Sequence, residues 1–345
     1  MTPEHTFTDQ FLKTNDLSNN PAINIHQKVP KYPWGHERRY NDYPTFIRQR
    51  FGGRVQKLSI NAGFTCPNRD GSKGTKGCSY CNNNTFRPGY CEPEKSVTQQ
   101  IDEGVQVFYK KHPDSKFMAY FQSYSNTYAE IDLLDRVYDE ALMHPKVHGL
   151  VIGTRPDCIN AQVLDLIEQK AKSTFVAIEY GIESTLDTTL ERINRQHNYA
   201  ETIRAVKLTK NRNIHIGGHL ILGLPGESKA DMLSHASRIS KLGLDTLKLH
   251  QLQIVRNTPF AKEYKNRPDD FSLFELPEYI GFVVGFLELL DPGISIERFV
   301  NQSPGSMLIA PKWGMKNFEI VSKIEKKLQE RNTWQGRKHS LTVHN

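Results

Sequence analysis

Apolar and polar positions along this chain repeat in a strand-then-helix order. Apolar runs of strand length occur at 54–61, 116–123, 147–154, 175–183, 214–223 and 245–255. Segments with apolar residues at helical spacing alternate with these runs, at 96–112, 129–144, 160–172, 228–242 and 275–290. Further helical segments follow the run at 175–183 and end at about 211. Strands this apolar are usually buried on both faces in a parallel sheet. The order predicts an α/β protein, and six such units favour a partial (β/α)6 barrel over a flat doubly wound sheet.

The two ends of the chain depart from this repeat. The first 30 or so residues are polar and aperiodic, 293–299 is a candidate seventh strand, and the tail beyond Lys312 has a helical pattern before a polar end. No Pro/Gly-rich linker divides the centre. We therefore predict a polar N-terminal arm at 1–35, a core barrel at 36–292 and a basic C-terminal extension at 293–345.

Charge is concentrated in the same two flanks. The formal net charge is +7, and the segment 28–54 holds seven Lys/Arg against two acidic residues. The segment from 312 to the end holds eight Lys/Arg against three Glu. Basic flanks of this kind suit a polyanionic partner, because Lys and Arg contacts dominate phosphate binding. An ordinary solvated basic surface explains the charge equally well.

Several classes of protein do not fit the composition. No run approaches the roughly 18 apolar residues of a membrane span, and the first residues lack the basic-then-apolar pattern of a signal peptide. Five cysteines, an odd number, do not suggest a disulfide framework. We therefore expect a cytoplasmic protein with no membrane partner, in which clustered thiols serve as metal ligands or redox groups.

Three of the five cysteines lie within sixteen residues directly after the first strand. Cys66 precedes Cys78 by eleven intervening residues, and Cys78 and Cys81 form a CxxC pair. Three thiolates on a four-iron cube would leave one iron without a protein ligand, which is what a catalytic site needs. Lys73 and Lys76 could offset the negative charge. A structural zinc site completed by Cys91 is a serious alternative, and unconnected buried cysteines are a weaker one.

Polar residues interrupt the apolar strands mainly near their carboxyl ends, where the chemistry of a parallel barrel collects. They are Asn61, Gln122, Ser123, Thr154, Arg155, Glu179, Glu183, the GLPGE loop at 223–227, and the segment from His250 to Gln253. Two carboxylates on one buried apolar strand need partners, so Glu179 and Glu183 favour a functional role.

Six ordered motifs resemble the radical S-adenosylmethionine (SAM) superfamily. They are INAGFTCPNRDG with KGCSYCNN, SYSNTY, GTRPDC, EYGIES, NRQHNY and GHLILGLPGE. They are most similar to the YhcC/YtqA-type proteins, which are related to the Elongator catalytic subunit, and they cover about residues 36 to 310. The usual spacing in the superfamily is CxxxCxxC, and the longer first gap here is a feature of that group. The resemblance implies a partial (β/α)6 TIM-like barrel of the radical SAM type with N- and C-terminal extensions.

The resemblance also implies cofactors and site residues. Cys66, Cys78 and Cys81 would hold a [4Fe–4S] cluster whose open iron chelates SAM, and reductive cleavage would give a 5′-deoxyadenosyl radical that abstracts substrate hydrogen. The residues expected to contact SAM are Tyr80, Gln122, Ser123, Ser125, Glu179, Glu183, Arg195, Gly223, Pro225 and Gly226. Arg195 and His197 could meet the SAM carboxylate or a substrate phosphate. The alternatives are ordinary turns for the Ser-rich and GxPG segments and buried structural roles for His250, Cys91 and Cys158.

The substrate is less well defined than the chemistry. The basic flanks and the kinship with the Elongator subunit lead us to hypothesise a tRNA substrate, at a wobble uridine. A flavodoxin- or ferredoxin-like reductant is the expected protein partner. A radical SAM enzyme acting on a small molecule or a protein, and a non-catalytic zinc-stabilised RNA-binding protein, remain as alternatives.

Overall fold

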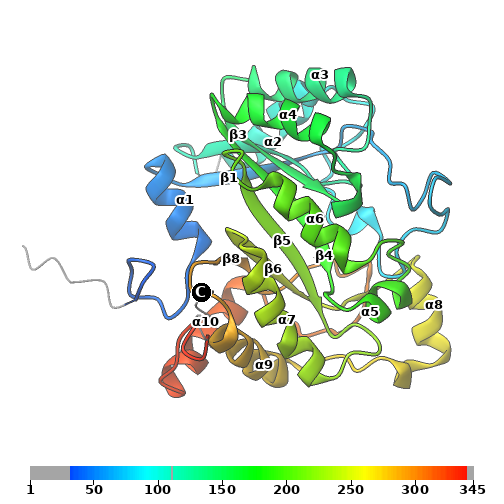
Figure 1. Cartoon of the computed structure of the whole chain (residues 1–345), viewed down its shortest axis with the longest axis vertical. Coiled ribbons are helices and arrows are strands. Elements are labelled where there is room, and N and C mark those ends of the chain that lie inside the picture. Colours follow the sequence, from blue (N-terminus) through cyan, green and yellow to red (C-terminus); the bar gives the residue numbers. More distant parts are fainter. Residues whose placement is uncertain (1–31, 110–111, 340–345) are drawn as a thin grey trace, which may run out of the picture.

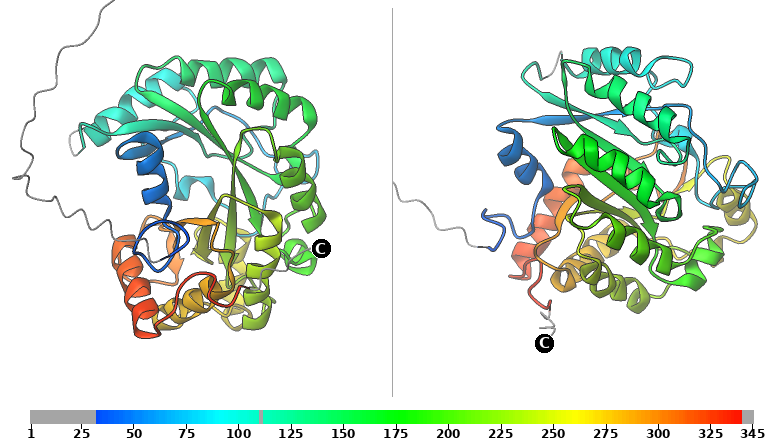
Figure 2. Two further views of the ribbon diagram at one scale, coloured as in Figure 1. Left: turned by 60° about the vertical axis from the view of Figure 1, so that its left-hand side comes forward. Right: turned by 45° about the horizontal axis from the view of Figure 1, so that its top comes forward.

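A single curled sheet organises the chain (Figures 1 and 2). The computed structural model describes residues 32–109 and 112–339. Seven parallel strands follow one another in spatial order β1-β2-β3-β4-β5-β6-β8. Their bounds are β1 Val55–Ile60, β2 Lys116–Phe121, β3 Val147–Thr154, β4 Phe175–Glu183, β5 His215–Leu222, β6 Thr246–Gln251 and β8 Ser295–Arg298. A small antiparallel pair, β7 Ile254–Val255 with β9 Leu308–Ala310, lies apart from the sheet.

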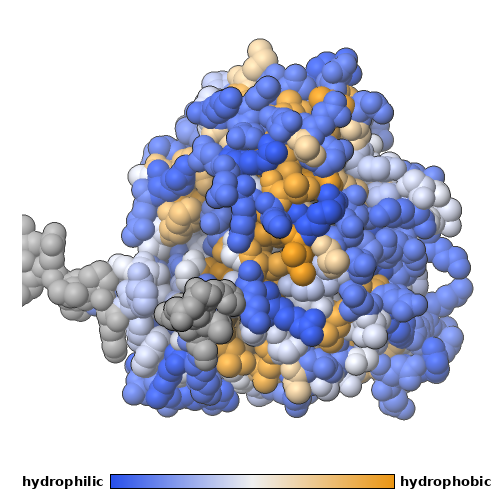
Figure 3. Space-filling view, in the orientation of Figure 1, coloured by the Kyte–Doolittle hydropathy of each residue, from blue (hydrophilic) through white to orange (hydrophobic). Residues whose placement is uncertain are grey.

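Helices connect the strands and cover the outer face of the sheet (Figure 2). Their bounds are α1 Tyr43–Phe51, α2 Val97–Tyr109, α3 Ile131–Leu142, α4 Ala161–Ala171, α5 Asp187–Arg192, α6 Tyr199–Thr209, α7 Lys229–Leu242, α8 Pro259–Asn266, α9 Leu276–Leu289 and α10 Asn317–Glu330. On the face shown in Figure 3, hydrophobic side chains gather near the middle and hydrophilic side chains surround them. The predicted α/β partial barrel is therefore confirmed.

Local sequence signals account for these elements. All nine residues of β4 are buried, as expected for an apolar strand covered on both faces. Helix α7 begins with a capping box, in which Ser228 and Asp231 satisfy each other's backbone N–H groups, and ends at Gly243 with a φ of 67°. These short-range interactions set where strand and helix alternate, which is why the pattern was readable from the sequence.

Two features differ from the sequence-based expectation. The segment 245–255 is not one strand, because β6 ends at Gln251 and β7 pairs with β9. The side chain of Gln253 donates to the Asn301 carbonyl and accepts from the Ser303 hydroxyl, so the chain turns here to meet residues that follow β8. Helices α1 and α8 were not predicted, although each has a recognisable start, with Asp42 and Thr258 accepting hydrogen bonds from the first turn.

The two edges of the curled sheet are joined across the open side of the barrel. Lys57 on β1 forms an ion pair with Glu297 on β8 at 2.7 Å. The backbone N–H of Ile296 on β8 donates to the Asn41 carbonyl at 2.7 Å. The chain then enters α1, which contacts both β1 and β8. The seventh strand predicted at 293–299 is thus confirmed, and the segment before α1 covers its free edge.

The same region brings the two basic flanks together. The Gln335 N–H donates to the Arg39 carbonyl at 2.9 Å, and the Arg39 guanidinium donates to the Thr333 carbonyl at 3.2 Å. Arg38 forms an ion pair with Glu325 of α10 at 3.4 Å. Figure 2 shows the segment after residue 32 beside α10. Exposed basic side chains from both flanks are Arg38, Arg48, Arg50, Arg54, Lys312, Lys316, Lys323, Lys326, Arg331, Arg337 and Lys338.

Most of the polar arm expected at 1–35 lies outside the described residues. The division into a core at 36–292 and an extension from 293 remains a prediction, although β8 of that extension is hydrogen-bonded to β6. Within the ranges that the structure describes, no helix is both long enough and apolar enough to cross a membrane.

Candidate active site

One cavity opens at the carboxyl ends of the strands and contains all three clustered cysteines. Cys66, Cys78 and Cys81 line it, together with residues that follow β2, β3, β4 and β6. With its open mouth the cavity measures about 1250 Å³. Much of that space is open to solvent, and the enclosed part measures about 190 Å³.

The cysteine loop is fastened to the segment after α5. The Asn68 amide donates to the Asn194 carbonyl at 2.6 Å, and the Asn194 amide donates to the Gly77 carbonyl at 2.7 Å. The Ser79 N–H donates to the Ile193 carbonyl at 2.9 Å. Gly77 has a φ of 71°, a left-handed conformation that favours glycine. These contacts fix the backbone on both sides of Cys78.

Three donors surround the sulfur of Cys78. The Arg195 guanidinium lies 3.5 Å from Sγ, the Asn68 amide 3.6 Å and the Arg155 guanidinium 3.9 Å. Cys78 is 4% exposed, Arg155 3% and Arg195 6%. Two guanidinium groups and one amide are therefore directed at a single buried sulfur.

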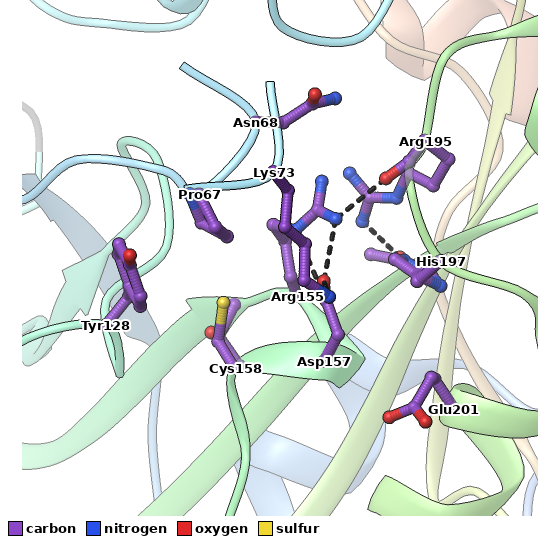
Figure 4. A network of polar contacts seen from close by, with 12 residues as sticks. Pro67, Asn68, Lys73, Tyr128, Arg155, Asp157, Cys158, Arg195, His197 and Glu201 are labelled. Atoms are coloured by element: carbon purple, nitrogen blue, oxygen red, sulfur yellow. Dashed lines mark hydrogen bonds and ion pairs between the residues drawn. The ribbon is translucent and has the colours of Figure 1, made fainter. Parts of the chain in front are cut away.

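Two arginines and two carboxylates lie near this sulfur, and Figure 4 shows the contacts of Arg155 with Asp157 and with the Arg195 carbonyl. Asp157 forms a bidentate ion pair with Arg155, at 2.9 Å for both contacts, and also pairs with Lys73 at 2.6 Å. Although burial opposes ionisation, Arg155 holds the pKa of the Asp157 carboxyl below its ordinary value. Glu183 lies 3.7 Å from Arg195. Arg155 and Arg195 thus balance Asp157 and Glu183, while Lys73, whose side chain is 41% exposed, adds a positive charge on the solvent side of this network.

The other cysteines have different surroundings. Burial, assisted by the nearby Cys78, raises the pKa of the Cys81 thiol to about 11, and the Arg69 guanidinium opposes this shift. Cys91 and Cys158 are buried outside the cavity lining, and burial raises the pKa of each to about 12. Within 32–109 and 112–339, no three His, Cys, Asp or Glu side chains converge as the ligands of a single metal ion would. A four-iron cube binds each thiolate at a different corner and does not need that convergence.

The cavity gathers many of the other predicted residues. Those in its lining are Tyr80, Gln122, Ser125, Thr154, Arg155, Glu179, Glu183, Arg195, His250, Gln251 and Gln253. Those outside its lining are Asn61, Ser123, His197, Gly223, Pro225 and Gly226. Gly223 has a φ of 91° and faces Phe274 and Leu252, so the GLPGE turn has a conformational reason for its first glycine. For the predicted cofactor residues of both groups, contact with SAM remains a prediction.

A buried ion network that includes Glu179 forms part of the cavity floor. Glu179 accepts from Lys248 at 2.6 Å, Lys57 at 2.7 Å and His219 at 3.0 Å. Burial acts against the charged carboxylate, but Lys248 and Lys57 outweigh it and hold the pKa of Glu179 well below its usual range. The partners that a buried carboxylate requires are therefore supplied by the protein itself.

Sequence reasoning missed the partners of Glu179 and several lining residues. Lys57 and Lys248 each interrupt an apolar strand, which is the signal that could have found them. Arg298 at the end of β8 offered the same signal. The missed lining residues include Arg69, Asn83, Tyr124, His219, Lys248, Arg298, Asn301 and Ser303.

Comparison with known proteins agrees with this architecture. The family model described as "Radical SAM superfamily" matches residues 65–239, and that of the "Radical_SAM C-terminal domain" matches 244–330. The chain is 33% identical to Protein YhcC of Escherichia coli K12, over 82% of this chain and 90% of that protein. It is 21% identical to a tRNA uridine(34) acetyltransferase of Methanocaldococcus infernus, over 53% of this chain and 33% of that protein. The solved structure of Methanocaldococcus infernus Elp3 with an N-terminal deletion superposes with a TM-score of 0.62 at 16% identity, covering 81% of this chain and 64% of that one.

Proposed function

The chain belongs to the radical SAM superfamily, and on that basis we propose that Cys66, Cys78 and Cys81 hold its [4Fe–4S] cluster in this cavity and that its substrate is a tRNA uridine. Members of this superfamily are enzymes that use a [4Fe–4S] cluster and SAM. We assign these three residues as the cluster ligands because all three thiols of one loop line one cavity.

The donor set and the charges fit such a cluster. A [4Fe–4S] core of charge 2+ with three thiolates carries a net charge of −1. Around Cys78, the positive charges of Arg155, Arg195 and the exposed Lys73 exceed the negative charges of Asp157 and Glu183 by one. In addition, Nε of Arg195 is buried without a hydrogen-bond partner. The protein is therefore prepared to stabilise an anion at this position.

The cluster with bound SAM supplies a 5′-deoxyadenosyl radical when one electron arrives from a reductant, for which we propose a flavodoxin- or ferredoxin-like protein. The chain's own residues position the cofactor and restrict water. Tyr80, Gln122, Ser125 and Glu183 line the cavity and are our candidates for contacts with SAM. We assign Glu179 instead to the floor network, because its charge is already matched by two lysines.

The proposal of an RNA substrate rests on the joined basic flanks. Two segments separated by about 290 residues in sequence meet through the contacts of Arg39 with Thr333 and Gln335. Basic side chains on neighbouring segments can reach the same stretch of phosphate backbone, which basic side chains on distant segments cannot do. The likeness to a tRNA uridine(34) acetyltransferase supports the choice of RNA.

Anaerobic purification tests the cluster. We expect about four irons and four sulfides per chain, a visible band that bleaches with dithionite, and formation of 5′-deoxyadenosine with SAM. Cys78→Ser should lose the cluster, whereas Cys91→Ser should retain it. Zinc without iron, together with zinc loss in Cys91→Ser, would instead establish a structural zinc site.

Filter binding of unfractionated tRNA at several salt concentrations tests the substrate class. We expect binding that weakens steeply as salt rises, because counterions are released from the RNA. Absence of salt-sensitive binding would refute the RNA part of the proposal and leave the cluster assignment intact.

A further inference from the structure

Arg298 is a cation in the cavity wall that the described part of the chain does not neutralise. It ends β8, lines the cavity and is partly buried. Its side chain has no hydrogen bond or ion pair with any residue of the described ranges 32–109 and 112–339. An unpaired guanidinium in the wall of a cavity can form ion pairs and hydrogen bonds with a ligand there.

The neighbouring carboxylates are already matched by other cations. Glu179 pairs with Lys57 and Lys248, at 2.7 and 2.6 Å. Glu297, next to Arg298 in sequence, pairs with the same two lysines at 2.7 and 3.2 Å. Two lysines and two glutamates sum to zero charge. The positive charge of Arg298 is therefore in excess.

Arg298 lies on β8, whereas the cysteine loop follows β1. Its charge acts on Tyr120, Lys248 and His250, which belong to β2 and β6. Arg195, in contrast, lies 3.5 Å from the Cys78 sulfur and has a free Nε, so an arginine is already available to an anion next to the cluster. Arg298 is thus left to serve a second ligand.

The surrounding side chains suit a polar ligand held in a fixed orientation. Gln253, Asn301 and Ser303 line the same wall and are linked to one another by hydrogen bonds of 2.7 to 3.4 Å. The guanidinium of Arg298 can bind the two oxygens of an anionic group bidentately. The neighbouring amide and hydroxyl groups can hydrogen-bond to polar atoms of the ligand next to that anionic group.

We infer that Arg298 and the adjoining amide wall form a subsite for an anionic group of the substrate, a carboxylate or a phosphate. The inference rests on the proposed function for the presence of a substrate in this cavity. Arg298 would then contribute to substrate specificity, because it would hold the anionic group of the substrate while another part of the substrate faces the cofactor.

The test measures binding of acetate and of inorganic phosphate, each compared with chloride at equal ionic strength. Thermal shifts of the protein, with and without cluster and SAM, give apparent dissociation constants for wild type, Arg298→Gln and Arg298→Lys. Arg256→Gln is the matched control, because Arg256 is exposed, lies outside the cavity lining and is hydrogen-bonded to the Ser306 carbonyl. Equilibrium dialysis of SAM on the reconstituted enzyme is the second readout.

We expect Arg298→Gln to weaken anion binding at least tenfold, Arg298→Lys to weaken it less, and Arg256→Gln to leave it unchanged. Affinity for SAM should stay within twofold in all variants. Binding of phosphate alone would identify a phosphate ester as the anionic group, and binding of acetate alone would identify a carboxylate. Each of these results supports the subsite.

Two results would overturn the inference. One is anion binding that is undetectable in wild type or equal in Arg298→Gln. The other is a tenfold loss of SAM affinity in Arg298→Gln, which would assign Arg298 to the SAM carboxylate. Because these assays use no RNA and also run on cluster-free protein, failure of tRNA binding or of cluster assembly would count against the proposed function and not against this subsite.

Discussion

Removing the Glu179 carboxylate should destabilise the protein strongly. In Glu179→Gln, the lysines at 57 and 248 would share Glu297 as their remaining carboxylate partner within 32–109 and 112–339, at 2.7 and 3.2 Å. The side chain of Lys248 is 3% exposed, so water cannot replace the lost partner. Leaving a buried charge unpaired costs about 3 to 5 kcal/mol, and we expect a loss of that size in the free energy of unfolding.

The assay is urea unfolding of the cluster-free protein at neutral pH, followed by circular dichroism and by fluorescence. Cluster-free protein is used because bound cofactors add their own binding energy to the apparent stability. The comparison is reliable where both signals give the same transition. Glu179→Met combined with Lys248→Met should recover much of the loss, because an apolar pair of similar volume replaces the broken ion pair.

This prediction also separates two roles for Glu179. A loss below about 0.5 kcal/mol, the usual range for a surface substitution, would refute the structural role. If the same variant then bound SAM much more weakly, Glu179 would be a cofactor contact, as the sequence led us to expect. A large loss of stability with unchanged affinity for SAM would support the floor network.

Three further predictions follow from other contacts. Arg195→Gln removes a cation 3.5 Å from the Cys78 sulfur and should make cluster reduction about tenfold less favourable, about 59 mV for one electron, in an EPR-monitored redox titration. The control is Arg192→Gln, whose exposed guanidinium pairs with Glu263 and whose loss should leave the reduction potential unchanged. Equal reduction potentials in the two variants would contradict the role of Arg195. Burial, assisted by the Arg195 charge, lowers the pKa of His197 to about 3, from 6.5. The unfolded chain therefore binds this proton first, and stability of the cluster-free protein should fall as pH drops from about 6.5 towards 3. His197→Asn should lose less stability over that window, and identical pH profiles would count against the shift. The double variant Lys323→Gln, Lys326→Gln on α10 should reduce the slope of log affinity for tRNA against log salt by about 1 per lost phosphate contact. The control Lys207→Gln on α6 should leave that slope unchanged. A larger effect of the α6 variant would mean that RNA does not bind at α10.

The cysteine loop and the order of elements could be predicted because their signals are local. Cys78 and Cys81 are three positions apart, and Cys66 joins them through a glycine-containing loop directly after β1. Likewise, the apolar run of β4 and the capping box of α7 each lie within one short segment. Neighbouring residues supply the physics in each case, so one sequence is enough to recognise it.

The partners of Glu179 could not be predicted in this way. Lys57 is 122 positions away and Lys248 is 69 positions away. Whether their ammonium groups reach the carboxylate depends on the curl of the sheet and on the register of every strand between them. The sequence indicated that Glu179 needs partners, but a cofactor and two lysines satisfy that need equally well.

By itself, the sequence determined an alternating α/β chain, a parallel sheet and a three-cysteine loop at the end of its first strand, because hydrophobic periodicity and short spacings act over a few residues. Only the tertiary structure decided that two basic flanks join through Arg39 and Gln335. It also decided that the lysines neutralise Glu179 and Glu297, and that Arg298 lines the cavity with no partner among the residues that the structure describes. The reason is that closure of the barrel brings β1 and β8 together across 240 positions of chain, and charges can pair only after the sheet has curled.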